Sequence, residues 1–259
     1  MAEQTKREPT LRVTGLTKRF GGLTAVDNMD MNVYAGEVVG LIGDNGAGKS
    51  TLIKMISGVY RPDEGKIFLE GEETTFVSPL EARRLGVETI YQDLALCENL
   101  DATVNIFLGR EPMRRSLGVL KAVDRKLMLN ESRSVLDRLD IHIPNLRKPI
   151  REMSGGQRQA VAIARAVYWN ARLMIMDEPT AALGVPEQRK VLHLVDTLRE
   201  QNVPVLIISH NLQDVFAVAD RVVIMRRGRK VGERRIEDTS IDELVTLMVG
   251  GDLVREGRN

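Results

Sequence analysis

Cysteine is almost absent from this chain, with Cys97 the single one among 259 residues. One thiol cannot close a disulfide within the chain, and it cannot supply a zinc site built on cysteine pairs. The cysteine content therefore favours a reducing, cytosolic setting and excludes a small protein held together by a disulfide framework.

Long apolar runs are also missing. The longest, such as residues 203–208, have the length of a strand, whereas a membrane-spanning helix needs ~20 apolar residues. The first eight residues are polar and lack the apolar stretch of a secretory signal. We therefore expect that the chain does not cross a membrane by itself.

Neither sign of charge is in excess, because 37 basic and 36 acidic residues leave a net charge of +1. No overall field steers the chain towards nucleic acid, although local basic patches are compatible with this balance. The apolar share of 43% is ordinary for a protein that buries a core. The length fits one large α/β domain with an inserted subdomain, or two small domains.

The pattern of apolar residues divides most of the chain into strands and helices. The run 37–42 is typical of a strand buried on both faces. From about residue 157 helices and strands alternate, which predicts a mainly parallel sheet flanked by helices. The expected strands are 11–20, 25–33, 37–42, 66–70, 87–91, 172–177, 203–209 and 221–226, and the expected helices are 49–57, 78–85, 157–169, 187–201, 212–219 and 240–250.

Residues 93–149 have a different character, with helical patterns rich in Leu, Arg and Asp, for example 124–139. This predicts a helical subdomain inserted between core strands. The chain as a whole, 1–259, is expected to be one domain. About 10–92 and 157–250 form its catalytic core with an N-terminal β part, and about 93–156 form the helical subdomain.

A glycine-rich segment lies between the buried strand and the helix that follows it. It matches the Walker A pattern of a phosphate-binding loop in the context that this pattern requires. Its glycines let backbone N–H groups converge on an anion, and the helix adds its positive N-terminal end. Lys49 would reach the β- and γ-phosphates, and Ser50 would hold Mg²⁺. The segment reads Gly43, Asp44, Asn45, Gly46, Ala47, Gly48, Lys49, Ser50 and Thr51.

Two carboxylates, Asp177 and Glu178, end the apolar run 173–176. In enzymes with such a phosphate loop, an acid at this place supports Mg²⁺ directly or through water, which we expect of Asp177. Glu178 points to the other side of the strand end and is the candidate base that polarises the attacking water. The pair alone would also fit a solvated acidic turn, but the phosphate loop in the same chain favours the catalytic interpretation.

A second helix start combines serine and glycine. Ser154, Gly155, Gly156 and Gln157 open a helix, and Ser and Gly at such a place form another anion-binding N-terminus. The tetrad alone would also fit a plain helix cap, but its spacing to Asp177 favours a functional interpretation. One chain that binds one ATP needs one phosphate cradle, so the second predicts a phosphate of its own.

Together these three motifs resemble the ATPase subunit of an ATP-binding-cassette (ABC) transporter, over roughly residues 10–250. The family usually has Leu where Met153 stands, a tolerable apolar exchange. The resemblance implies an α/β fold: a P-loop NTPase core with a mainly parallel sheet, an N-terminal antiparallel β subdomain and an inserted helical subdomain. It implies ATP and Mg²⁺ as cofactors. It also implies head-to-tail dimers, in which each signature (residues 153–157) covers the ATP on the opposite loop.

Three further positions fit motifs of that family. Phe20 matches the aromatic that stacks on adenine. Gln92 matches the Q-loop glutamine that senses Mg²⁺ and the γ-phosphate and meets the membrane partner, and His210 matches the switch histidine on the γ-phosphate. Alone, Phe20 would also fit a core position, and Gln92 and His210 would fit ordinary polar caps. The resemblance implies that Gln92 and His210 act with Glu178 in catalysis.

One position departs from the family pattern. After residues 177–180 the family typically has a Ser-Ala-Leu-Asp-like D-loop, whereas this chain ends the corresponding stretch with Leu183 and Gly184. We expect ATP hydrolysis to survive because Glu178 is present. We expect the coupling between the two sites of the dimer to be looser because the carboxylate is missing.

The resemblance extends to a role in uptake. No membrane span is fused to the cassette, as in bacterial importers, so the implied partners are a second ATPase subunit, two separate permease subunits and, indirectly, a solute-binding protein. The segment 98–111 looks like that of monosaccharide importer ATPases of the ribose, xylose and fructose type. This implies an ATP-hydrolysing subunit of a monosaccharide importer, peripheral on the cytoplasmic face of the inner membrane, with no nucleic-acid partner.

Two alternatives stay open from the sequence. One is the ATPase subunit of a branched-chain amino-acid importer, also a single cassette of similar length. The other is a soluble ABC ATPase that acts on a ribosome or on DNA, which the balanced charge and the lone Cys97 disfavour. The sequence does not name the sugar, because the ATPase does not touch it, and it leaves homodimer and heterodimer both open.

Overall fold

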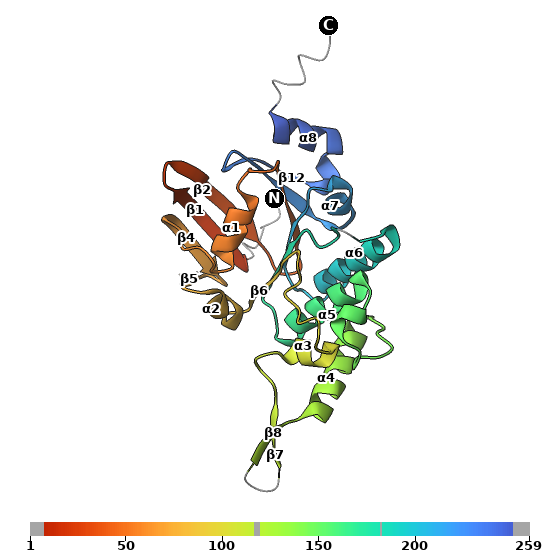
Figure 1. Ribbon diagram of the computed structural model, residues 1–259. Coiled ribbons are helices and arrows are strands. Elements are labelled where there is room, and N and C mark those ends of the chain that lie inside the picture. The colour runs from red at the N-terminus through yellow and green to blue at the C-terminus, as the bar shows by residue number, and fades with distance from the viewer. Residues whose placement is uncertain (1–7, 117–119, 182, 251–259) are drawn as a thin grey trace, which may run out of the picture.

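The computed structural model describes residues 8–116, 120–181 and 183–250, and it contains two main sheets, a small hairpin and helices around them (Figure 1). The strands are β1 Leu11–Phe20, β2 Leu23–Val33, β3 Val38–Ile42, β4 Glu64–Leu69, β5 Glu72–Thr74, β6 Val87–Ile90, β7 Met113–Ser116, β8 Leu120–Val123, β9 Leu173–Asp177, β10 Val205–Ile208, β11 Arg221–Arg226 and β12 Arg229–Arg235. The helices are α1 Lys49–Ile56, α2 Pro79–Arg84, α3 Ala102–Phe107, α4 Arg125–Arg138, α5 Gly155–Tyr168, α6 Val185–Glu200, α7 Leu212–Val218 and α8 Ile241–Val249, with 3₁₀ turns η1 Ile150–Glu152 and η2 Ile236–Asp238.

The N-terminal sheet is antiparallel, with the strand order β2-β1-β4-β5. In β1 and β2, buried apolar residues alternate with exposed polar ones, which is the period of a sheet with one face covered. Leu11, Val13 and Leu16 are fully buried in the cluster that this sheet shares with α1. The predicted antiparallel β subdomain is therefore present, and β5 is a short strand that the sequence pattern did not predict.

The central sheet has the order β12-β11-β3-β10-β9-β6, and all its pairs are parallel except β11 with β12. Strands β3 and β10 are buried along their whole length, because helices α5, α6 and α7 cover one face and α1 with the N-terminal sheet covers the other. Gly40 in β3 permits this close packing, since a Cβ there would lie 2.5 Å from the Cγ1 of Val215 in α7. The predicted mainly parallel sheet is confirmed, whereas β12 was not predicted.

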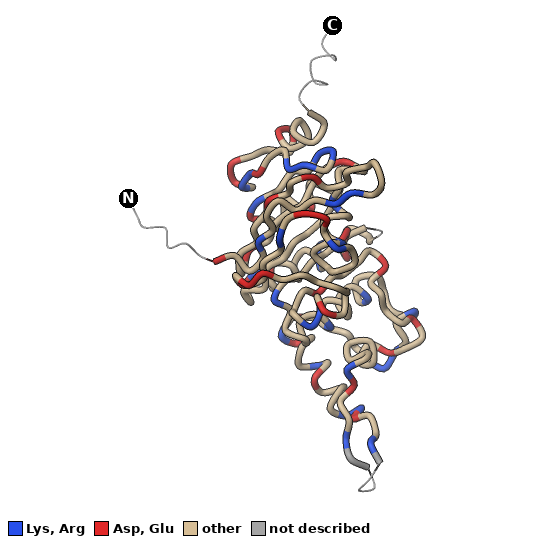
Figure 2. The backbone as a smooth tube through the Cα atoms, turned by 90° about the vertical axis from the view of Figure 1, so that its left-hand side faces the viewer, with Lys and Arg blue, Asp and Glu red and all other residues tan. Residues whose placement is uncertain are grey.

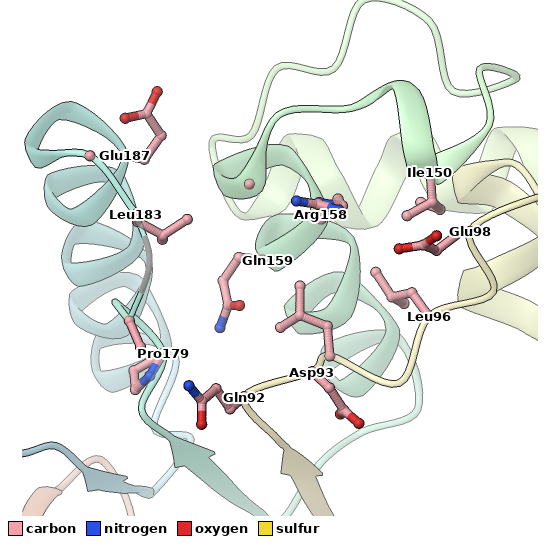
Figure 3. A pocket seen from close by; sticks show the side chains of 14 residues that line it. Gln92, Asp93, Leu96, Glu98, Ile150, Arg158, Gln159, Pro179, Leu183 and Glu187 are labelled. Carbon is pink, nitrogen blue, oxygen red and sulfur yellow. The ribbon is translucent and has the colours of Figure 1, made fainter.

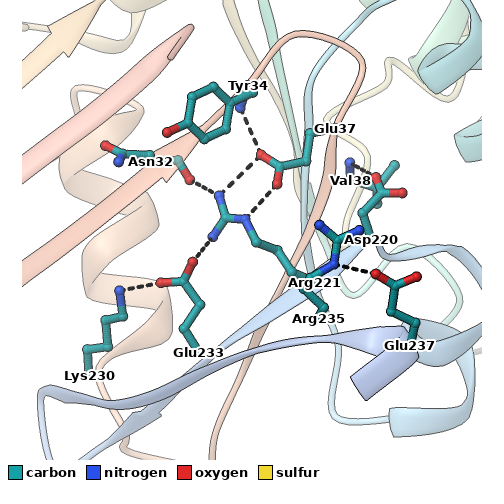
Figure 4. Close-up of polar contacts among 10 residues, drawn as sticks. All are labelled: Asn32, Tyr34, Glu37, Val38, Asp220, Arg221, Lys230, Glu233, Arg235 and Glu237. Carbon is teal, nitrogen blue, oxygen red and sulfur yellow. Dashed lines mark hydrogen bonds and ion pairs between the residues drawn. The ribbon is translucent and has the colours of Figure 1, made fainter. Parts of the chain in front are cut away.

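A polar network joins the two sheets (Figure 4). Arg221 in β11 donates to the Oε1 of Glu37 at 2.6 Å and to the Oε1 of Glu233 at 2.8 Å, and it also donates to the carbonyl oxygen of Asn32 in β2. Burial lowers the pKa of Arg221, but the hydrogen bond and charge of Glu37 and the charge of Glu233 outweigh it and raise the pKa. The guanidinium therefore stays charged and holds the edge of β2 against β11 and β12.

The segment between β6 and α5 contains α3 and α4, which pack on α5 (Figure 1). Asn105 in α3 is fully buried, and its side-chain amide is satisfied by hydrogen bonds to the backbone of the preceding residues Cys97, Leu100 and Asp101. The expectation that 93–149 is helical throughout is wrong in one part, since β7 and β8 form an antiparallel hairpin there. Because this hairpin projects beyond α3 and α4, it depends on the pairing between its own two strands.

The structure also bears on membrane crossing. Among the helices of the described residues, none combines the length and the apolar character that a bilayer span requires.

Candidate functional site

The phosphate loop connects β3 to α1 and depends on glycines at strained positions. Gly43, Gly46 and Gly48 have φ values of 150°, 82° and 104°, which side chains rarely adopt. Space is restricted as well: a Cβ on Gly43 would collide with the carbonyl oxygen of Met225, and one on Gly48 would lie 2.5 Å from that of Ala25. The loop is therefore pinned between β2 and β11, which fixes the direction of its N–H groups.

Lys49 lies inside this loop. Its Nζ donates to the carbonyl oxygens of Gly43 at 2.5 Å and Asp44 at 3.1 Å, and the side chain is buried. Burial lowers the pKa of Lys49, while the charges of Glu178, Asp44 and Asp177 act to raise it. The ammonium group thus sits among acidic groups at the loop, where a polyphosphate would favour its charged form.

A cavity of about 580 Å³ opens beside the loop. Phe20 and residues 45–51 line it, so the residues expected to stack on adenine and to bind the phosphates face one space. Phe20 is 42% exposed, it meets Tyr60 edge-on with the ring centroids 5.3 Å apart, and the Nζ of Lys18 lies 5.6 Å from its ring centroid. The turn residues Arg227 and Gly228 also line the cavity. Their neighbouring sequence carries no motif, and only the pairing of β11 with β12 brings them here.

The two carboxylates at the end of β9 lie in different surroundings. The pKa of Asp177 is raised by burial and by the charge of Glu178, against the opposing charge of Lys49. Glu178 has a φ of 53°, a left-handed conformation that is uncommon for a residue with a side chain. Its N–H donates to the carbonyl oxygen of Ile208 at 2.9 Å, which ties the turn to the end of β10.

Glu178 contacts His210 directly. The Oε2 of Glu178 lies 2.7 Å from the Nδ1 of His210, and the backbone N–H of His210 donates to the Oε1 at 3.1 Å. The His210 side chain is 72% exposed. The structure therefore brings together two predicted residues that are 32 positions apart in the chain.

A buried hydrogen bond, which no sequence motif indicates, holds this arrangement. The Oγ1 of Thr180 donates to the Oδ2 of Asp214 at 2.6 Å, and both side chains are buried. Asp214 lies in α7, which begins shortly after His210. The bond therefore links the turn after Glu178 to the helix after His210, and it positions both residues without contacting the reaction centre.

The signature opens α5 with a complete capping box. The Oγ of Ser154 accepts from the N–H of Gln157 at 3.3 Å, and the Oε1 of Gln157 accepts from the N–H of Ser154 at 3.1 Å. Gly155 lines one cavity, and Ser154 and Gly156 line another, neither of which contains the phosphate loop. Within one chain the signature and the loop are thus two separate sites.

Gln92 also lies apart from the phosphate loop. It lines a cavity of about 500 Å³ between the loop after β6, the start of α5 and the segment after Glu178. Figure 3 shows Gln92 and Gln159 directed into this space beside Pro179. Gln159 is 3% exposed, and its Nε2 has no hydrogen-bond partner among the described residues. Gly184 lines the same cavity, and a Cβ added there would meet the Oε2 of Glu187 at 2.9 Å.

A further cleft lies on the other side of the loop after β6, and we call it the docking cleft after the role proposed for it below. Its lining includes Arg83, Glu88, Tyr91, Ala95 and Leu108. Glu88 is buried, and burial raises its pKa although the nearby Arg83, whose Nε donates to it at 3.2 Å, acts to lower it. The rim carries an exposed apolar side chain, Leu108, at 40% exposure.

Comparison with known proteins agrees with this geometry. The family described as "ABC transporter" matches residues 26–181. The xylose/arabinose import ATP-binding protein XylG of Sulfolobus acidocaldarius is 47% identical, and the matched region spans 92% of this chain and 93% of that protein. The fructose import ATP-binding protein FrcA of Rhizobium meliloti is 46% identical, over 94% and 95%. The ribose import ATP-binding protein RbsA 1 of Rubrobacter xylanophilus is 46% identical over 93% of this chain, which spans 47% of that longer protein.

Solved structures show the same fold. The ADP conformation of MJ1267, an ATP-binding cassette of an ABC transporter, superposes with a TM-score of 0.79 at 27% identity and covers 95% of this chain and 97% of its own. The dimeric cassette MJ0796, at 23% identity and a TM-score of 0.72, supports the fold alone. The predicted fold class is confirmed, and the chain belongs to the ABC transporter family as one of its ATP-binding cassettes.

Proposed function

We propose that this chain is the ATP-hydrolysing subunit of a membrane importer for monosaccharides and that it works as a pair of cassettes. The observation that carries the proposal is the separation of two phosphate-binding helix starts in one chain. The loop before α1 and the signature before α5 line different cavities, so each is half of a site. A second cassette placed head to tail would complete both.

Within each composite site the residues have distinct roles. Lys49 and the N–H groups of residues 45–51 bind the phosphates, and Phe20 stacks on the base. Glu178 orients and polarises the attacking water, and it takes up proton density from it. His210, held against Glu178 at 2.7 Å, contacts the γ-phosphate. The signature of the second copy closes the site and excludes bulk water.

The residues near the loop fit Mg²⁺. Asp177 is a carboxylate that burial and Glu178 leave destabilised in its charged form, and a cation would compensate it. Ser50, in the first turn of α1, lines the cavity beside the phosphate loop. The described residues contain no cluster of three or more acidic, His or Cys side chains able to hold a metal, which suits an ion that keeps waters and binds mainly through phosphates. When bound, Mg²⁺ would offset the charge that develops on the phosphates. Ser50 and Asp177 would hold it, and Gln92, which lies in a separate cavity in the single chain, would join them when the cassette pair closes.

The docking cleft is the proposed contact with the permease. It lies next to the loop that carries Gln92, and its rim joins the apolar Leu108 to charged groups around Glu88. Closing of the cassette pair would move this loop and the helices of 93–156 and so transmit the motion to the permease. A monosaccharide cargo is supported by the names of the relatives, which import xylose/arabinose, fructose and ribose. The location would be peripheral, on the cytoplasmic face of the inner membrane.

The test is to purify the tagged full-length chain from gently solubilised native membranes and to identify the proteins that accompany it. We expect an integral permease and a solute-binding protein, and the ligand of that binding protein would name the sugar. The variant Leu108→Asp tests the docking cleft, because it should lose the permease while it retains nucleotide binding. A ribosomal or nucleic-acid partner without a permease would refute transport, and a binding protein for branched-chain amino acids would refute sugar as the cargo.

A further inference from the structure

The hairpin β7–β8 concentrates positive charge in a protein whose net charge is close to zero. Residues 110–126 contain six Lys or Arg and two Asp or Glu, a net charge of +4, whereas the whole chain carries +1. The rest of the chain is therefore net negative. Figures 1 and 2 show that this hairpin projects beyond α3 and α4, with Lys and Arg along it.

The exposed side chains of this region form what we call the basic hairpin surface. It consists of four basic residues interleaved with three apolar ones. Met113, Val123 and Leu127 are 53%, 38% and 42% exposed, although residues of this size and polarity are usually buried. Among the described residues, Arg114, Lys121 and Lys126 form no ion pair. The members are Met113, Arg114, Lys121, Val123, Arg125, Lys126 and Leu127.

The pairing of the strands adds a second observation. Met113 pairs with Val123, so these two exposed apolar side chains lie next to each other on one face of the hairpin. An isolated two-stranded hairpin is marginally stable by itself. Contact with an anionic surface would therefore stabilise it. Exposed apolar residues set among basic ones are suited to the boundary between phospholipid headgroups and acyl chains.

The position of the hairpin in the fold points to the same surface. The chain passes from Leu108, on the rim of the docking cleft, to the start of β7 at Met113 within five residues. If the permease occupies that cleft, as the proposed function has it, the hairpin emerges beside the permease at the membrane. We propose that the basic hairpin surface binds anionic phospholipid headgroups and inserts Met113 and Val123 at the interface, as a second membrane contact independent of the permease.

The experiment is flotation of the purified full-length chain with lipid vesicles, without any permease. Vesicles of phosphatidylglycerol and phosphatidylcholine in equal parts are compared with vesicles of phosphatidylcholine alone. We expect binding to the anionic vesicles only, and we expect it to weaken at high salt, where the Debye length falls to ~3 Å. The double variant Arg114→Gln/Lys121→Gln should lower the partition coefficient about fivefold for each charge removed, so about 25-fold.

Two further variants make the result specific. Arg61→Gln/Lys66→Gln removes the same charge from β4 and the loop before it and should leave vesicle binding unchanged. Met113→Ser keeps the charge and should cause a smaller loss that persists at high salt. Nucleotide binding of each variant, measured with a fluorescent ATP analogue, shows that the cassette is folded.

Several results would overturn the inference. These are equal binding to neutral vesicles, no binding to either kind, and an equal loss in the control double variant. If the Arg114/Lys121 variant loses the permease in purification from membranes but keeps its vesicle binding, the surface is a protein contact instead. Copurification of the permease with the unmodified chain tests the proposed function separately, so either proposal can fail without the other.

Discussion

Replacement of Glu178 by glutamine should separate ATP hydrolysis from ATP binding. The carboxylate accepts from the N–H of His210 at 3.1 Å and faces its Nδ1 at 2.7 Å. A glutamine has the same shape, so its carbonyl oxygen can keep the first contact and its amide can serve the second. The local structure should therefore persist, and only the charge and the basicity are lost.

The magnitude follows from the role of the group. A positioned general base contributes ~10²–10⁴ to the rate, which corresponds to about 2.7–5.4 kcal/mol of the barrier at 1.36 kcal/mol for each factor of ten. ATP binding should stay equal or become tighter, because Glu178 also places negative charge close to Asp177 and to the phosphates. The variant should then accumulate as a closed, ATP-bound pair.

Phosphate release under saturating Mg-ATP measures the first effect, and gel filtration with and without Mg-ATP measures the second. The matched control is Glu73→Gln, which removes an exposed carboxylate paired with Lys66 on the N-terminal sheet. It should hydrolyse ATP at the normal rate. Hydrolysis by Glu178→Gln within about threefold of the unmodified protein would refute the assignment of the base, since the expected loss is ~10²-fold or more. Elution of this variant only as a monomer with Mg-ATP would refute the composite site.

Four other predictions follow from the site and its supports. Asp177→Asn should abolish Mg-dependent hydrolysis yet raise the melting temperature of the nucleotide-free protein at pH 7. Because the pKa of Asp177 is raised in the folded protein, its ionised form costs stability, and the stability from this group falls as pH rises through the folded pKa. If the pH profile of stability is the same in the variant as in the unmodified protein, this reasoning is contradicted. Gly48→Ala should lower the free energy of unfolding by about 3 kcal/mol or more, and Gly46→Ala by only about 1 kcal/mol, because both have positive φ but only Gly48 also lacks room for a Cβ; equal values in urea unfolding would be inconsistent with the packing. Arg221→Ala should cost about 3 kcal/mol in the same assay because it leaves the half-buried Glu37 without its cation, whereas Glu233 keeps Lys230, and Arg221→Lys should cost less. Gly184→Asp should raise the Hill coefficient of ATP hydrolysis if the missing carboxylate loosens the coupling of the two sites; Gly184→Ser, which can cap α6 without charge, is the control, and equal Hill coefficients for all three proteins would refute the idea.

Much of the fold could be predicted because local chemistry dictates it. The runs at β3, β9 and β10 are apolar throughout, since a parallel strand is buried on both faces, and their positions are confirmed. Capping residues mark helix starts equally well: Ser78, Ser154 and Ser240 each accept a backbone N–H at the beginning of α2, α5 and α8. The phosphate loop was predictable for the same reason, because its glycines and Lys49 must be contiguous in sequence.

Other elements could not be predicted because their residues carry no local pattern. The strand β12 consists mostly of charged residues without an alternating pattern, and it joins the sheet by pairing with β11. The strands β7 and β8 lie in a segment whose composition favours helices. The bond from Thr180 to Asp214 joins positions 34 residues apart, and no spacing rule indicates it.

The sequence by itself determined the kind of chemistry. Each function depends on residue types that are adjacent in the chain. The loop 43–51 therefore indicates a bound nucleotide, Asp177 and Glu178 indicate a metal-supporting acid and a base, and the tetrad at Ser154 indicates a second phosphate cradle. Only the tertiary structure decided how these parts meet. It placed Glu178 against His210 by the parallel pairing of β9 with β10, and it left the signature in a different cavity from the phosphate loop. Distances between residues remote in sequence are set by the packing of sheets and helices, which no local pattern encodes.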